Sequence, residues 1–339
     1  MCHQATAKSL QKKISKETAA AERQRLVNAM PSTRSKDFFS SCSTADAAAW
    51  LDAAAKPGSC TAMSDAAFAC AARIRLSIPL QRPFGRKPSH KAAQSAKEAK
   101  ASSAAWRCGR VQCKLPGTTQ QQPHSLDHAY LCPGQRAVIT NRHTAVLNTL
   151  TDFSKRATTG MNAGRVTLRK EPYMEADLGY TPKEAANRNQ RADLSITVTG
   201  MDGSVEKLVV DLVGTHPGAG EAATADMPGE ASQQGHWAEV ASQRKIDSYT
   251  GHYNIPHSEL YPFAFETGGL LHERAREFIS RLTRLVHRTY DPQVGRVVGY
   301  DTLRRQLVEQ ISVAVQSQNA RVVIMYLNSV TRRDKLADG

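Results

Sequence analysis

Residues 191–213 read RADLSITVTGMDGSVEKLVVDLV, and this stretch decides the fold. β-Branched and apolar residues dominate residues 194–199 and 207–213, so the sequence predicts two strands there. Asp202-Gly203 between them is a hairpin turn signal. Similar patterns around the hairpin predict further strands at 164–168 and 262–266 and a helix at 237–249. We therefore predict an α/β (α+β) fold, a mixed sheet flanked by helices.

Two acidic residues mark the ends of this hairpin. Asp193 opens the first strand, and Asp211 lies inside the apolar second strand. A carboxylate in an apolar strand is costly unless another group pairs with it. Across a hairpin both side chains can reach one end of the sheet, where two carboxylates can hold Mg²⁺, or Mn²⁺ in its place. Lys245, on the next predicted helix, is the candidate to orient water or to neutralise a phosphate.

Each of these residues also has a purely structural interpretation. Asp193 could simply begin a strand at a turn, and most helix lysines such as Lys245 are solvated. Asp211 is harder to explain without a partner. Glu171, just after the first predicted strand, is the candidate for a third carboxylate.

A Cys/His cluster precedes the predicted sheet. Cys108, Cys113, His128 and Cys132 form the pattern C-x4-C-x14-H-x3-C. Zinc takes four such ligands in a tetrahedron, and its binding would supply the folding energy of this stretch. His124 and His143 remain alternatives for one ligand. The competing interpretation is scattered thiols and surface histidines.

The positive charge is confined to the first part of the chain. Residues 1–150 contain 22 of the 45 Lys and Arg but 8 of the 31 Asp and Glu, so the net charge of +14 lies entirely there. Such an excess favours a polyanionic partner, with nucleic acid as the default. The N-terminus has no apolar signal-peptide core, and no run of about 18 apolar residues exists, so we expect neither secretion nor a membrane role. An odd cysteine count in such a chain indicates a reducing compartment.

Composition and periodicity divide the chain into six predicted segments. They are a basic arm (1–38), a helical segment (39–80), a linker (81–105), a zinc module (106–143), a domain with the predicted sheet and its acids (144–290) and C-terminal helices (291–339). The last segment is expected to hold an amphipathic helix followed by a separate apolar stretch at 322–330.

The order of these motifs resembles the restriction-like endonuclease region of early-branching non-LTR retrotransposon proteins. The matching pieces are DHAYLC (127–132), RH (142–143), EP (171–172), RAD (191–193), VVDLVGTHP (209–217), RKIDSY (244–249) and PFAFETGG (262–269). The resemblance implies a PD-(D/E)xK fold behind a zinc module and Mg²⁺-dependent hydrolysis of a DNA phosphodiester that nicks a target strand. It implies metal-binding acids at Asp193 and Asp211, a catalytic lysine at Lys245, and nucleic-acid contacts from Arg142, His143, Arg244 and Tyr249.

The sequence departs from that family's pattern in three ways. Ala192 replaces the proline of PD, and Val213 stands where many nucleases of this fold carry a lysine. No Tyr-x-Asp-Asp signature is present, so a reverse transcriptase encoded elsewhere is an expected partner, besides DNA or RNA. Two alternatives stay open: a non-catalytic zinc-containing nucleic-acid-binding protein or decayed relic, and a junction resolvase or repair nuclease of the same fold. We expect a nuclear location.

Overall fold

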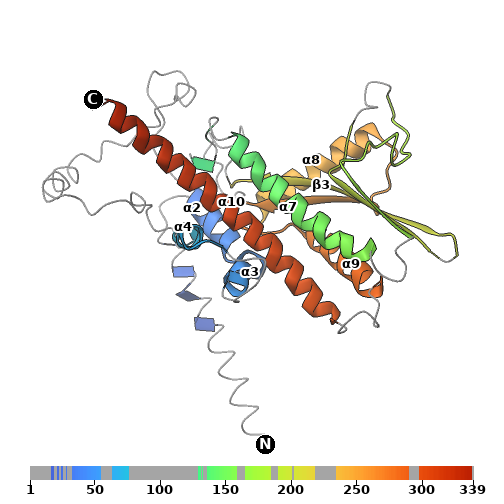
Figure 1. The fold of residues 1–339 in the computed structure, drawn as a ribbon, viewed down its shortest axis with the longest axis horizontal. Helices are drawn as coiled ribbons and strands as arrows, with labels where there is room; N and C mark the ends of the chain where they lie inside the picture. Colours follow the sequence, from blue (N-terminus) through green and yellow to red (C-terminus); the bar gives the residue numbers. More distant parts are fainter. Residues whose placement is uncertain are drawn as a thin grey trace, which may run out of the picture.

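The computed structural model describes residues 17–18, 21–22, 24–25, 28, 33–54, 63–75, 129–130, 132, 136–158, 165–184, 190–200, 202–217, 234–289 and 298–337. Its four strands form one sheet, in the order β1 (Val166–Lys170), β2 (Leu194–Thr199), β3 (Val205–Thr215) and β4 (Leu260–Glu266). β1, β2 and β3 pair antiparallel, and β4 pairs with β3 in parallel. The predicted mixed sheet flanked by helices is confirmed (Figure 1).

The β2–β3 hairpin forms at the predicted turn. Leu194 pairs with Val210 and Thr199 with Val205. In the turn, Gly203 adopts a φ of 80°, which the absence of a Cβ permits. The Asp202 Oδ1 atom accepts a hydrogen bond from the Ser204 N–H at 3.0 Å. This turn fixes the register of the two strands, and with it the position of Asp193 relative to Asp211.

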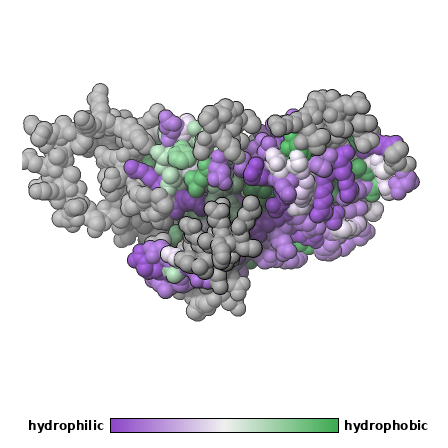
Figure 2. Space-filling model, turned by 90° about the horizontal axis from the view of Figure 1, so that it is seen from below, coloured by the Kyte–Doolittle hydropathy of each residue, from purple (hydrophilic) through white to green (hydrophobic). Residues whose placement is uncertain are grey.

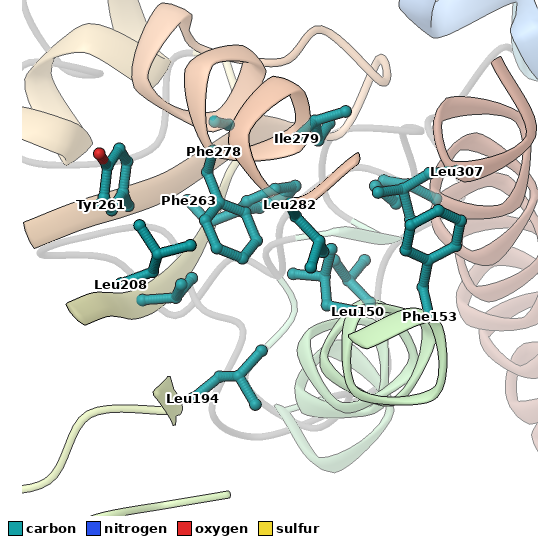
Figure 3. Close-up of a cluster of buried hydrophobic side chains, with 14 of the residues drawn as sticks. Leu150, Phe153, Leu194, Leu208, Tyr261, Phe263, Phe278, Ile279, Leu282 and Leu307 are labelled. Atoms are coloured by element: carbon teal, nitrogen blue, oxygen red, sulfur yellow. The ribbon is translucent and has the colours of Figure 1, made fainter. Parts of the chain in front are cut away.

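Helices cover both faces of the sheet. On one face, leucines of β2 and β3 pack against α7 (Arg136–Lys155) and α9 (Glu273–Thr289). In Figure 3, Phe263 of β4 faces Phe278 and Leu282 of α9, and Leu150 and Phe153 of α7 lie between the sheet and Leu307. On the other face, Val209 packs in one cluster with Tyr249 of α8 (His236–His252) and with Tyr253 directly after that helix. β4 is buried along its whole length, as expected of a parallel strand covered on both sides.

A third layer contains α10 (Tyr300–Ala337), which packs on α7 and α9. On it lie the N-terminal helices α3 (Ala45–Ala54) and α4 (Asp65–Arg75), and α2 (Thr33–Cys42) packs on α3 (Figure 1). The Trp50 backbone N–H donates to the Ser312 Oγ atom at 3.2 Å. The described parts of the predicted 39–80 and 291–339 segments therefore share one core.

Two predicted boundaries differ from the structure. α7 begins at Arg136 and crosses the boundary placed at 143/144. Pro133-Gly134 shortly before it in the sequence is the helix-breaking signal closer to its start. α10 is continuous, so residues 322–330 are part of it and not a separate stretch. Polar residues at its buried positions, Ser312, Gln316 and Asn319, interrupt the apolar period and hide this continuity in the sequence.

No helix among the described residues is both long and apolar enough to cross a membrane. In Figure 2 the coloured part of the visible surface is mainly hydrophilic, with a smaller hydrophobic area beside grey atoms. Among the described residues, the large exposed hydrophobic side chains are Leu51, Phe68, Val205 and Met325.

Candidate active site

Asp211 is the buried acid at the centre of the candidate site. It lies in β3 on the face that α8 covers, and its side chain is 7% exposed. Lys245 of α8 places its Nζ atom 2.6 Å from the Asp211 Oδ2 atom, and its own side chain is about a third exposed. At this distance the ammonium and the buried carboxylate form an ion pair. The expected partner of the mid-strand carboxylate is therefore Lys245.

Asp193 lies beside Asp211 across the start of the hairpin. Its backbone N–H donates to the Val210 carbonyl at 3.0 Å, and its Oδ2 atom accepts from the Leu212 N–H at 2.6 Å. The same Oδ2 atom lies 3.1 Å from the His143 Nε2 atom of α7. The site thus joins both helical layers, with Lys245 from α8 on one side and His143 from α7 on the other.

The two carboxyl groups have opposite pKa shifts. Burial raises the pKa of Asp211 to about 7, where Lys245 opposes the shift and Asp193 adds to it. Burial also acts upward on the pKa of Asp193, but hydrogen bonds from His143 and Leu212 hold it below its ordinary value. The hydrogen bond to Asp193 raises the pKa of His143 against the effect of its burial. The pair therefore combines one ionised acid with a second acid whose buried negative charge needs a cation.

Glu171 borders the site without joining the acid pair. Its N–H donates to the Asp193 carbonyl at 2.9 Å, and its φ of 53° is the only positive value at a non-glycine among the described residues. Its exposed carboxylate Oε2 atom lies 4.0 Å from the Arg191 Nη1 atom. The structure therefore places Glu171 next to Asp193 through the backbone, with its side chain paired to Arg191.

Two predicted nucleic-acid contacts do not fit their positions. Arg142 is buried: its Nη1 atom donates to the Asn319 Oδ1 atom at 3.0 Å, and burial lowers its pKa to about 10. Tyr249 is also buried, with its hydroxyl donating to the Arg191 carbonyl at 2.7 Å. The Arg142 guanidinium and the Tyr249 hydroxyl both donate to protein acceptors, because these residues lie on the buried faces of α7 and α8. Arg244 is exposed on α8, and His143 is half-buried against Asp193.

The predicted zinc ligands Cys108, Cys113 and His128, and the alternative His124, lie outside the described residues. Cys132 is described and is buried in the core that contains Trp50 and Val322. Within the described ranges, no group of three or more His, Cys, Asp or Glu side chains is arranged to hold a metal ion. Zinc binding stays a prediction.

Sequence reasoning did not anticipate the contact of His143 with Asp193, nor the pairing of Arg191 with Tyr173. The first depends on how α7 lies on the sheet, which no local pattern encodes. The second depends on an antiparallel bridge between Tyr173 and Arg191, residues too far apart in the sequence for a local pattern to predict their contact.

Comparison of the chain with protein-family models, with curated proteins and with solved structures finds no match. The chemistry that Asp193, Asp211 and Lys245 can perform is therefore inferred from their own geometry.

Proposed function

We propose that the protein is a divalent-metal-dependent DNA endonuclease of the PD-(D/E)xK type that nicks a target strand. The observation that carries this proposal is the meeting of Asp193, Asp211 and Lys245 at one end of the β2–β3 hairpin. The mixed sheet with helices on both faces and the lysine on the helix after the second acid strand support the same proposal. So does the resemblance of the sequence motifs to retrotransposon endonucleases.

The acid pair fits a hard divalent cation. Asp193 and Asp211 offer carboxylate oxygens, which Mg²⁺ and Mn²⁺ prefer, and Mg²⁺ needs only one or two of them because it keeps several waters. Burial disfavours the negative charge of Asp211 and raises its pKa to about 7, and a bound cation would stabilise that charge. Such a cation lowers the pKa of a bound water and stabilises charge on the phosphate.

The remaining groups have distinct roles in this proposal. The Leu212 N–H and His143 fix one oxygen of Asp193 and so set the direction of its carboxylate. The side chain of Lys245 is about a third exposed. Once a cation takes the place of Lys245 as the partner of Asp211, the lysine ammonium could contact a phosphate oxygen or orient water. Tyr249 holds the backbone of Arg191, two residues from Asp193, and so supports the site without contacting substrate.

Nicking of a supercoiled plasmid tests the proposal. We expect the parent chain to nick in Mg²⁺, and Asp193→Asn to lower the rate by at least about 100-fold, because it removes a metal-holding charge without changing side-chain shape. Asp202→Asn is the matched control, since Asp202 is an exposed acid in the turn of the same hairpin. Equal nicking by the parent and Asp193→Asn would refute the assignment. DNA binding without nicking by the parent would favour the non-catalytic alternative.

A further inference from the structure

Next to the acid pair, Arg191 and Tyr173 form a stacked pair at the surface. The two residues make an antiparallel β-bridge, and the Arg191 guanidinium carbon lies 4.1 Å from the centre of the Tyr173 ring. Arg191 also donates a hydrogen bond to the Tyr173 hydroxyl. The Arg191 side chain is 50% exposed. One face of the guanidinium is therefore covered by tyrosine while the side chain stays accessible to a ligand.

The pair is held rigidly on both sides. The Tyr173 N–H donates to the Asp177 Oδ2 atom at 2.8 Å, and Arg169 donates to the Asp177 Oδ1 atom at 2.9 Å. The Arg191 carbonyl accepts the Tyr249 hydroxyl of α8. A planar group fixed in this way loses little conformational freedom when a ligand stacks on it.

The position of the pair relates it to the candidate active site. Arg191 and Asp193 are separated only by the buried Ala192, so their Cα atoms lie at most about 7 Å apart. Glu171 contacts both residues, because its N–H donates to the Asp193 carbonyl and its carboxylate lies 4.0 Å from the Arg191 Nη1 atom. A nucleotide next to a phosphodiester held at the acid pair would lie within reach of Arg191.

The chemistry of the pair favours a base over a phosphate. Arg191 already uses one donor on the Tyr173 hydroxyl, and the Glu171 carboxylate lies 4.0 Å from another of its nitrogens. A phosphate approaching this edge would meet a like charge, whereas a neutral base stacking on the exposed plane would not. Stacking of bases on aromatic and guanidinium planes is a common mode of single-strand recognition.

We propose that Arg191 and Tyr173 form a stacking platform for an unpaired nucleobase that flanks the cleaved phosphodiester. The placement of that base beside the cut rests on the proposed nuclease function, but the stacking itself does not. A base inside a duplex is already stacked on its neighbours, so the platform selects a strand that is single or locally melted at the site.

Binding of oligonucleotides without Mg²⁺ tests this platform, since no cleavage is needed. The probe is a single-stranded DNA 20-mer carrying 2-aminopurine, compared with its duplex. Arg191→Lys keeps the charge and loses the plane, so we expect about 5- to 10-fold weaker single-strand binding, less quenching of 2-aminopurine and nearly unchanged duplex binding. Arg284→Lys, at an exposed arginine of α9, is the matched control and should change neither.

Tyr173 supplies a second pair of variants if Arg191→Lys fails to fold. Tyr173→Leu removes the supporting ring and should reproduce the loss, whereas Tyr173→Phe keeps the ring and should retain most of the single-strand preference. Unchanged single-strand binding in Arg191→Lys and Tyr173→Leu would overturn the proposal. Equal losses on single strand and duplex, with a smaller salt dependence, would overturn it in favour of a phosphate contact. If the parent chain shows this single-strand preference but does not nick plasmid, only the proposed nuclease function is refuted.

Discussion

Lys245→Met is expected to destabilise the metal-free protein on the order of 2–4 kcal/mol at pH 8, and by less than about 1 kcal/mol at pH 5. The reason is the ion pair with Asp211, which is 7% exposed and loses the cation 2.6 Å from its carboxylate in this variant. Below the raised pKa of Asp211, about 7, the acid is protonated and needs the lysine less. Urea unfolding at the two pH values, with chelator present, measures the difference.

A double variant identifies the cause of this loss. Adding Asp211→Asn to Lys245→Met removes the unpaired buried charge, so most of the stability lost at pH 8 should return. Arg244→Met is the matched control, because Arg244 is the exposed neighbour on α8 and its change should stay within about 0.5 kcal/mol. A loss that is equal at both pH values, or that Asp211→Asn does not reverse, would show that Lys245 acts through packing alone.

Asp211→Asn by itself is expected to stabilise the metal-free protein as pH rises. In the parent, the folded-state pKa of Asp211 is raised from 3.8 to about 7, so between these values the folded state binds more protons than the unfolded state. The parent therefore loses stability as pH rises through 7, on the order of 2–4 kcal/mol between pH 4 and pH 8, and the asparagine variant lacks this loss.

Chemical unfolding across this pH range, parent against Asp211→Asn, measures that slope. At pH 4 the two folded proteins carry the same charge at position 211, so their difference there reports mainly packing. Mg²⁺ should reduce the slope of the parent, because a bound cation stabilises the ionised acid. Parallel curves of unfolding free energy against pH for the two proteins would contradict the assignment of Asp211 as a buried acid with a raised pKa. Greater metal-free stability together with lost nicking is the combination expected of a residue kept for function.

The hairpin and its acids were predictable because local chemistry specifies them. Asp202-Gly203 between two β-rich runs fixes the turn, and the cost of burying Asp211 in an apolar strand demands a cationic partner. The strand at 260–266 is mainly apolar up to its last residue, Glu266, and the sequence predicted it at 262–266. These features depend on a few neighbouring residues and on general desolvation energetics.

Features that depend on packing between distant segments were not predictable. Arg142 and Tyr249 are polar residues in motif positions, and only the inward orientation of α7 and α8 shows that their polar groups serve protein partners. The continuity of α10 is masked by Gln316 and Asn319, which bond to the carbonyls of Gly268 and Thr267 in the turn after β4. A single sequence does not reveal which polar residues will find such buried partners.

The most direct test of the central claim, that Asp193 and Asp211 together hold a divalent cation, is Mn²⁺ binding followed by electron paramagnetic resonance. The experiment uses the full chain with zinc present and without DNA, and it compares the parent with Asp193→Asn/Asp211→Asn. We expect about one Mn²⁺ per parent chain and at least tenfold weaker binding in the double variant, because two carboxylates are the charged ligands of the site. Equal Mn²⁺ affinity in the two proteins would contradict the claim.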